Sequence, residues 1–286
     1  MQSQLDLLFE PATLPVIPAS IGQAEVRGVS TKQILTPATG FMSAFDYTLN
    51  PYGGCTFGCS YCYAAFFAGS TERRERWGYW VDVKQNAVEQ IRRSRGTYGK
   101  KIYMSSVTDP YQPIERELGL TRGMLEVLAE PERQPRLVVQ TRSPLVARDT
   151  DVLSRLARVR VNMTITTDDE AVRKRFEPLC PSNERRIEAL REMKSAGVRI
   201  GVCVTPMLPL RDPVAFARRL ADLQADVYVA QPFKPSRGPF AASTRQTATD
   251  ILEEFGWTES SYRRAFDELR RHLPHLYEGQ DGFMPE

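Results

Sequence analysis

Short apolar runs alternate with longer amphipathic segments along the chain from about residue 46. Val, Ile, Tyr and Thr dominate the apolar runs, and charged residues or Pro bound each of them. Runs of this kind are typical of strands buried in a parallel sheet. The pattern therefore predicts six strands, at 46–50, 101–106, 136–141, 159–166, 198–206 and 226–233.

The segments between these runs have the end signals of helices. Asp or Thr stands at several starts as a candidate N-cap, and Pro or Gly follows several ends. The predicted helices cover 82–95, 121–130, 149–157, 182–196 and 212–224, with one more near 259–272. Repeated strand–helix units predict right-handed crossovers around a parallel sheet, with ligands at the carboxyl ends of the strands. Six units are too few for a closed eight-stranded barrel, which leaves a partial barrel or a doubly wound sheet.

Composition divides the chain into three regions. Residues 1–40 are rich in Pro, Thr and Ser, which predicts an N-terminal extension lying over a larger body. Residues 41–235 contain the α/β pattern. Residues 236–286 are less apolar, which predicts a small helical appendage at the C-terminus.

Bulk composition excludes several classes of protein. With 286 residues, 42% of them apolar and 26% charged, the chain can bury a large core and is not of low complexity. A net charge of +3 does not by itself indicate a nucleic-acid partner. The sequence contains no run of 18 apolar residues and no basic, apolar leader, so we expect a cytoplasmic protein without a membrane partner.

Three of the five cysteines lie close together, immediately after the first predicted strand. Cys55, Cys59 and Cys62 have the spacing CxxxCxxC. A structural zinc site needs four ligands, so Cys180, Cys203 or a histidine of the tail would have to complete it. An iron–sulfur cube held by only three cysteines instead leaves one iron open to an outside ligand. Zinc, an iron–sulfur cluster and unligated thiols are therefore the alternatives.

The cysteine motif resembles the signature loop of the radical S-adenosylmethionine (SAM) enzymes. That resemblance implies a partial (β/α)6 barrel and a 4Fe–4S cluster on Cys55, Cys59 and Cys62, with SAM on the open iron. It also implies that reduction by a partner such as flavodoxin or ferredoxin cleaves SAM to a 5′-deoxyadenosyl radical, which abstracts hydrogen from the substrate. Tyr61, directly before the third cysteine, is where the family packs an aromatic residue near the adenine.

Blocks of sequence outside this loop resemble one branch of the family. The blocks at 50–64, 105–115, 140–149, 163–178 and 184–209 are similar to the spore photoproduct lyase-like, or DNA repair photolyase-like, enzymes. The resemblance extends over about residues 30–235. It implies a lyase-like enzyme that acts on a nucleic-acid base, with DNA or RNA as the substrate partner.

The same resemblance implies roles for residues at the end of the second predicted strand. Ser105 and Ser106 lie where family members contact the methionine part of SAM, and their hydroxyl and N–H groups can hydrogen-bond it. Asp109 follows in a turn stiffened by Pro110 and Pro113, where it faces the cofactor or only shapes the turn. Ordinary capping of the strand end is the alternative for the two serines.

Two more cofactor contacts are implied on the third and fourth strands. Arg142 matches a basic residue directed towards SAM, where a guanidinium can pair with the methionine carboxylate. Thr164 matches a hydroxyl residue near the ribose or carboxylate. Asn162 and Thr166 are alternatives, because they share its face of the strand.

The resemblance also implies a hydrogen-atom relay, with one departure from the family. Tyr61 and Tyr63 match a tyrosine pair that returns hydrogen atoms to SAM, although Tyr63 can equally pack in the core. Ser106 stands where spore photoproduct lyase has the cysteine that donates hydrogen to the product radical. Because a serine O–H bond is much stronger than a thiol S–H bond, this departure argues against that particular repair route. Cys203 is either a replacement donor or a core residue.

Two stretches at 71–80 and 92–101 combine arginines with aromatic residues. They are either a nucleic-acid surface or solvated faces with Trp77 and Trp80 turned inward. The loop at 234–240 is a candidate substrate lid. Three functions therefore compete: a radical SAM enzyme for a nucleic-acid base, one for a small metabolite or peptide, and a non-catalytic metal protein. The oligomeric state is not determined by the sequence.

Overall fold

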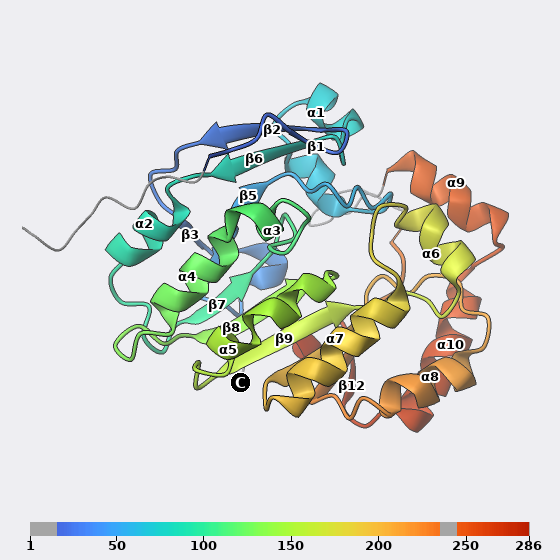
Figure 1. The fold of residues 1–286 in the computed structure, drawn as a ribbon. Helices are drawn as coiled ribbons and strands as arrows, with labels where there is room; N and C mark the ends of the chain where they lie inside the picture. The colour runs from blue at the N-terminus through green and yellow to red at the C-terminus, as the bar shows by residue number, and fades with distance from the viewer. Residues whose placement is uncertain (1–15, 235–244, 286) are drawn as a thin grey trace, which may run out of the picture.

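All six predicted strands are present in the computed structural model, which describes residues 16–234 and 245–285. They lie in one eight-stranded sheet in the order β12-β11-β10-β9-β8-β7-β4-β3 (Figure 1). Every neighbouring pair is parallel except β3 with β4. The strands are β3 Leu35–Pro37, β4 Tyr47–Leu49, β7 Lys101–Met104, β8 Arg136–Thr141, β9 Val159–Thr164, β10 Arg199–Val204, β11 Val227–Ala230 and β12 Leu276–Glu278.

Among the residues that the structure describes, six helices lie close to their predicted positions, and four short ones were not predicted. The predicted set is α2 Ala87–Arg93, α4 Leu120–Leu128, α5 Thr150–Leu153, α7 Asn183–Ser195, α8 Pro213–Ala221 and α10 Glu259–His272. The others are α1 Thr71–Glu75, α3 Glu115–Leu118, α6 Glu170–Phe176 and α9 Gln246–Glu254. Short 3-10 helices are η1 Gly40–Met42, η2 Tyr63–Phe67, η3 Pro144–Asp149 and η4 Gln280–Phe283.

The predicted start of the helix at 82–95 is wrong. Residues Trp80–Lys84 form a strand, β6, and the helix begins only after Asn86. Val81 and Val83 are fully buried, and the strand pairs in parallel with β2, Ala24–Val29. Alternating burial of two valines is a strand signal that the charged residues around them concealed.

A second, four-stranded sheet lies beside the first strands of the barrel (Figure 1). Its order is β1-β2-β6-β5, where β1 is Ser20–Ile21 and β5 is Tyr52–Gly53. The segment that precedes residue 40 therefore contributes strands to this sheet. Because β5 ends at Gly53, the cysteine loop starts from this sheet and runs towards the barrel.

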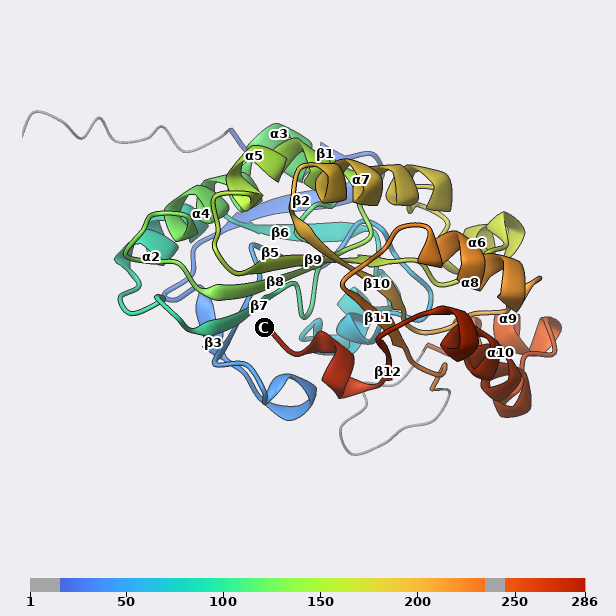
Figure 2. The ribbon, with the colours of Figure 1, turned by 90° about the horizontal axis from the view of Figure 1, so that it is seen from below.

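The curved sheet has helices on one side and the end of the chain on the other. Figure 2 shows α4, α5 and α7 along one face and the C-terminus against the opposite face. On that opposite face, Arg160 donates hydrogen bonds to the carbonyls of Gly282 and Met284, at 3.1 and 3.0 Å. Phe283 packs there in a buried cluster that includes Tyr103 and Cys203. The C-terminal region thus extends the barrel sheet through β12 and packs on its inner face, while the domain boundaries at 40 and 235 stay predictions.

None of the described helices combines the length and apolar character needed to cross a lipid bilayer.

Candidate active site

The cysteine loop lies at the edge of the sheet where the parallel strands end. It runs from Cys55 to Cys62, between β5 and η2, and closes on itself through hydrogen bonds from Gly58 N to Cys55 O and from Cys62 N to Cys59 O. At Gly58 the backbone has φ +59°, and an added Cβ would lie 3.1 Å from the Cα of Gly78. Glycine suits this position because it adopts positive φ without strain and because a side chain would push the two backbones apart.

The three cysteines are close together but differ in their surroundings. Cys55 and Cys59 are buried, with 5% and 2% of their surfaces exposed. The Sγ of Cys59 lies 3.5 Å from the Sγ of Cys180 and 3.3 Å from Nη1 of Arg142. The Cys180 thiol and then the Arg142 guanidinium lower the pKa of Cys59, whereas burial raises the pKa of Cys62 to about 11. Among the described residues, no three Cys, His, Asp or Glu side chains converge as ligands of one metal ion.

The surroundings of the loop nevertheless suit an anionic cofactor. Arg245, directly before α9, donates to the carbonyls of Gly58, Cys59 and Ser60, at 3.4, 3.2 and 3.0 Å. Two cationic side chains, Arg142 and Arg245, thus flank a loop that carries three thiols, and thiolates at that position would be stabilised by both charges. The buried hydroxyls of Ser60 and Thr56 have no hydrogen-bond partner in the described part of the chain. An iron–sulfur cluster held by thiolates fits this donor set and its charge.

Tyr61 belongs to a buried network of charges below the loop. Its hydroxyl donates to Oε1 of Glu177 at 2.5 Å, and Nη2 of Arg142 lies 3.4 Å from the same hydroxyl. Glu177 also pairs with Arg186 at 2.5 Å, and both side chains are fully buried. Although burial acts to raise it, the charges of Arg186 and Arg142 lower the pKa of Glu177 to about 2. Glu177 is not among the predicted site residues, because no spacing in the sequence connects it to the cysteine motif.

Ser105 and Ser106 form a turn at the end of β7, next to the loop. Ser105 is one of the few non-glycine residues with positive φ, at +86°. The carbonyl of Ser106 accepts a hydrogen bond from the hydroxyl of Tyr63. Tyr63 is 46% exposed, so it lies at the surface of the site rather than in the core.

The side chains of Asp109 and Thr164 already make hydrogen bonds to neighbouring residues of the protein. The carboxylate of Asp109 accepts hydrogen bonds from Thr141 Oγ1 at 2.7 Å and from the backbone N–H groups of Tyr111 and Arg142, both at 2.9 Å. It therefore holds the end of β8, and with it the base of Arg142. Burial raises the pKa of Asp109. Thr164 is buried, and its hydroxyl accepts from Nε2 of Gln140 at 2.7 Å.

Comparison with known proteins decides the family. The sequence pattern of the radical SAM superfamily matches residues 49–220, which is more than half of the chain. The chain belongs to the radical SAM superfamily. It is therefore an enzyme, and the cysteine loop and the strand ends around it lie inside the matched region.

Several relatives of this radical SAM enzyme are known. An uncharacterized protein of Methanocaldococcus jannaschii is 34% identical over 185 residues, which cover 65% of this chain and 68% of the relative. A radical SAM Nalpha-GlyT isomerase of Pseudomonas phage M6 is 28% identical over 162 residues, covering 56% of this chain but only 32% of the relative. The enzyme thus spans about two thirds of the first relative and a third of the second.

Solved structures show the same fold. A spore photoproduct lyase with a cysteine-to-serine substitution has a TM-score of 0.63 and 16% identity, covering 88% of this chain and 81% of that one. Another variant of that lyase, solved with bound AdoMet and dinucleoside spore photoproduct, has a TM-score of 0.60 at 16% identity and covers 88% and 80% of the two chains. These matches confirm the predicted partial barrel.

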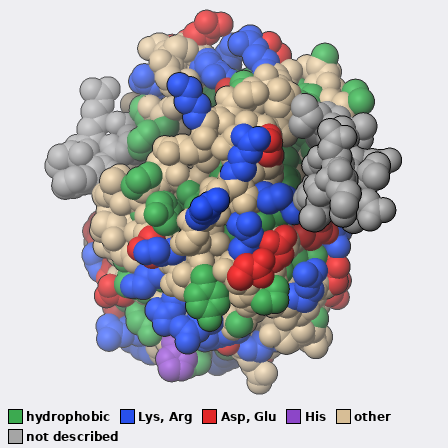
Figure 3. Space-filling view, turned by 90° about the vertical axis from the view of Figure 1, so that its left-hand side faces the viewer, with side chains coloured by type: hydrophobic (Ala, Val, Ile, Leu, Met, Phe, Trp, Pro, Cys, Tyr) green, Lys and Arg blue, Asp and Glu red, His purple; other side chains and the backbone are tan. Residues whose placement is uncertain are grey.

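Of the two basic stretches, only 71–80 packs against the cysteine loop, where Trp77 and Trp80 share a buried cluster with Cys55 and Cys59. Trp77 and Trp80 are buried and pack edge to face, with ring centroids 5.7 Å apart, and Arg73 pairs with Asp82 at 2.6 Å. Residues 92–101 lead into the start of β7, whereas the cysteine loop lies at the opposite, carboxyl edge. Figure 3 views the side on which α2 lies, where Lys and Arg side chains are mixed with acidic ones.

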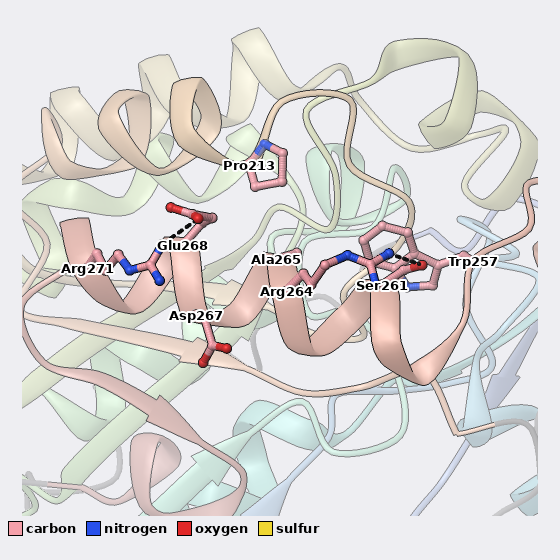
Figure 4. A pocket seen from close by; sticks show the side chains of 8 residues that line it. All are labelled: Pro213, Trp257, Ser261, Arg264, Ala265, Asp267, Glu268 and Arg271. Atoms are coloured by element: carbon pink, nitrogen blue, oxygen red, sulfur yellow. Dashed lines mark hydrogen bonds and ion pairs between the residues drawn. The ribbon is translucent and has the colours of Figure 1, made fainter.

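A separate open cavity of about 370 Å³ lies between α8 and α10 (Figure 4). Its charged groups are partly satisfied within the cavity wall, since Arg271 pairs with Glu268 and Arg264 donates to Ser261. None of the predicted site residues lines this cavity. The predicted lid at 234–240 lies, apart from Lys234, outside the described residues.

Proposed function

We propose that Cys55, Cys59 and Cys62 bind a 4Fe–4S cluster, that SAM binds to its open iron, and that the enzyme abstracts a hydrogen atom from its substrate. The observation that carries this proposal is the position of the cysteine loop, with Arg142 from the end of β8 placing its guanidinium 3.3 Å from Cys59 Sγ. When bound, the cluster and SAM supply a 5′-deoxyadenosyl radical after reduction by a flavodoxin- or ferredoxin-type partner.

The residues around the loop bind and orient SAM in this proposal. Arg142 and the turn at Ser105 and Ser106 bind the methionine part, and Thr164 contributes a hydroxyl from β9. Tyr61 packs near the adenine, with its hydroxyl held by a hydrogen bond to Glu177 at 2.5 Å. Asp109 acts on SAM only through Arg142, because its carboxylate accepts a hydrogen bond from the backbone N–H of Arg142.

The donation of a hydrogen atom to the product radical takes a different route from that in the lyase. Ser106 hydrogen-bonds through its hydroxyl to Asn50 Nδ2 at 3.0 Å, and it has no weak S–H bond to give. Cys203 is fully buried in the inner core, where its thiol contacts only Gln140 among polar groups of the described residues. The resemblance assigns the return of hydrogen to SAM to Tyr61 and Tyr63. We therefore assign the donation to the product radical to Tyr63 as well, because it is the more exposed of the pair.

An aromatic rim beside the turn supports a nucleobase as the substrate. Tyr63 and Phe67 pack edge to face on η2, with ring centroids 6.2 Å apart, and they are 46% and 66% exposed. Exposed rings of this kind stack on flat bases, at about 1–3 kcal/mol for each base. The structural relative solved with a dinucleoside agrees with this class. A small metabolite or peptide is the alternative that the experiment must separate from it.

Anaerobic reconstitution with iron and sulfide tests the cofactor. Each single change of Cys55, Cys59 or Cys62 to Ala is expected to abolish iron–sulfur loading and the formation of 5′-deoxyadenosine from SAM under reducing conditions. Cys203→Ala is the matched control and keeps both. One tightly bound zinc without sulfide in the wild-type enzyme, or SAM cleavage by the single Ala variants, refutes the proposal.

Substitution of the exposed ring tests the substrate class. Phe67→Ala is expected to weaken binding of short single-stranded oligonucleotides by about ten-fold, because one stacking surface is lost. Tyr98→Ala is the control, since Tyr98 is equally exposed at 68% but lies before β7, at the opposite edge of the sheet. Oligonucleotides that neither bind nor stimulate transfer of deuterium into 5′-deoxyadenosine, while small metabolites do, favour the alternative.

A further inference from the structure

The turn that follows β7 has a strained backbone. Ser105 adopts φ +86°, in the left-handed region that side chains other than glycine rarely occupy. Its hydroxyl bonds to the carbonyl of Thr108, and its N–H donates to the carbonyl of Leu49 at 2.9 Å. Strained residues of this kind persist only when their surroundings hold them, and they concentrate at functional sites.

Asn50 holds this turn from the neighbouring strand. Its Oδ1 accepts the N–H groups of Ser106 and Val107 at 2.9 and 3.2 Å, and its Nδ2 donates to the hydroxyl of Ser106 at 3.0 Å. The side chain is 7% exposed, so no water replaces these bonds easily. Lys84 fixes the backbone of Asn50 by donating from Nζ to its carbonyl at 2.8 Å.

The far end of the turn is tied to the cysteine loop. Gln112, which is fully buried, accepts the N–H of Thr56 at 2.9 Å and donates to Thr108 Oγ1 at 3.1 Å. The hydroxyl of Thr108 in turn donates to the carbonyl of Gly54 at 2.6 Å. The turn and the loop therefore form one hydrogen-bonded unit, and Asn50 is the residue that closes it on the side of β4.

We propose that Asn50 is a positioning residue for SAM, which holds Ser105 and Ser106 in the strained conformation that binds the methionine part. This inference rests on the proposed function, since it requires SAM at this turn. Without the amide, the N–H groups of Ser106 and Val107 lose their acceptor, and Ser105 relaxes towards an ordinary extended conformation. Binding then has to restore the turn, which lowers the affinity for SAM without removing any direct contact.

Equilibrium dialysis of SAM against the anaerobically reconstituted full chain tests this inference. Asn50→Ala is expected to weaken SAM binding by about ten-fold, the effect of losing one to two net hydrogen bonds, with iron and sulfide content unchanged. The change that SAM makes in the electron paramagnetic resonance spectrum of the reduced cluster is expected to shift to the same higher concentrations. Asn50→Asp retains the Oδ1 acceptor, and the Ser106 hydroxyl can donate to its other oxygen, so it is expected to bind SAM nearly as the wild type does.

Asn86→Ala is the matched control for the loss of an asparagine. Asn86 also holds a loop with both amide atoms, since its Oδ1 accepts the N–H of Thr31 and its Nδ2 donates to the carbonyl of Thr31, both at 2.9 Å. Because Thr31 lies beside the small sheet, far along the chain from the turn, we expect SAM affinity to be unchanged in this variant.

A second substitution separates positioning from general destabilisation. Glycine adopts positive φ without strain, so Ser105→Gly removes the conformational cost that Asn50 offsets. Because Ser105→Gly also removes a hydroxyl, the Ser105→Gly single variant is the reference for the double variant. Adding Asn50→Ala to Ser105→Gly is expected to lower SAM affinity at least three-fold less than adding Asn50→Ala to the wild type. If Asn50→Ala does not load a cluster, Asn50→Ser replaces it, because a hydroxyl on the shorter side chain does not reach both N–H groups.

The outcomes separate this inference from the function on which it rests. Wild-type affinity for SAM in the folded, cluster-loaded Asn50→Ala variant, or in the Asn50→Ser variant that replaces it, overturns the inference and leaves the proposed function intact. The inference is also overturned if Asn50→Ala lowers the affinity for SAM equally in the presence and in the absence of Ser105→Gly. A wild-type enzyme that carries a cluster but binds no SAM contradicts the proposed function itself.

Discussion

Replacing Glu177 with Gln changes a single charge at the centre of the buried network below the cysteine loop. The carboxylate accepts from the Tyr61 hydroxyl at 2.5 Å and from Thr166 Oγ1 at 3.0 Å, and it pairs with Arg186 at 2.5 Å. In Glu177→Gln, Tyr61 and Thr166 can still donate to the amide oxygen. Arg186, which is fully buried, is left facing an amide group instead of a carboxylate.

Two routes give the same magnitude for this loss. The pKa of Glu177 lies at about 2, against about 4.3 for an unperturbed glutamate, and each pH unit is worth about 1.4 kcal/mol, so the charge contributes about 3 kcal/mol. Removing one partner of a buried ion pair costs about 3–5 kcal/mol in other proteins. At about 2–4 °C for each kcal/mol in a chain of this size, the melting temperature is expected to fall by roughly 6–12 °C.

The dependence on pH gives the prediction a specific signature. Because the pKa of Glu177 is lowered by folding, its contribution is complete above about pH 4.3 and is lost as the pH falls from there through about 2. Thermal melts of the apo enzyme are therefore expected to show the full difference from Glu177→Gln at pH 7 and a shrinking difference below about pH 4.3.

An exposed glutamate is the matched control for this measurement. Glu188 is 73% exposed in its side chain and pairs with Arg191 at 3.5 Å, so Glu188→Gln is expected to change stability by less than about 0.5 kcal/mol. The expected fall in melting temperature is absent if Glu177→Gln melts within about 2 °C of the wild type at pH 7, which is roughly the resolution of such melts. That result refutes the reasoning.

Two further predictions concern the loop itself. Cys180→Ala is expected to keep full iron and sulfide content although its sulfur lies 3.5 Å from Cys59, whereas equal losses in Cys180→Ala and Cys59→Ala would show that Cys180 is a ligand. Arg245→Ala removes a donor from three loop carbonyls, of which that of Cys59 keeps the N–H of Cys62, so we expect it to destabilise the loop by about 1–3 kcal/mol and to speed iron loss to a chelator. Arg175→Ala is its control, since that half-exposed arginine of α6 pairs with Glu254 on α9, the helix that Arg245 precedes. Iron loss at the same rate in both variants would contradict the assigned role of Arg245.

The sequence by itself determined the elements whose signals are local. The six apolar runs predicted six strands, because β-branched residues between charged boundaries reflect burial on both faces of a sheet. The cysteine spacing is also local, so the candidate ligands could be named from eight consecutive residues. The family resemblance then supplied the cofactors, and the partial barrel was confirmed.

Only the tertiary structure decided which distant residues meet at the loop. Cys180 lies 121 residues along the chain from Cys59, and Glu177 lies 116 residues from Tyr61. Arg245 lies 185 residues from Ser60. No periodicity or spacing encodes such contacts, since they arise when crossovers bring the ends of separate strands to one edge of the sheet. For the same reason the sequence offered Cys180 only as one of several residues that could complete a zinc site. The chemistry of this site is thus encoded locally, while its charge and shape depend on how the whole chain folds.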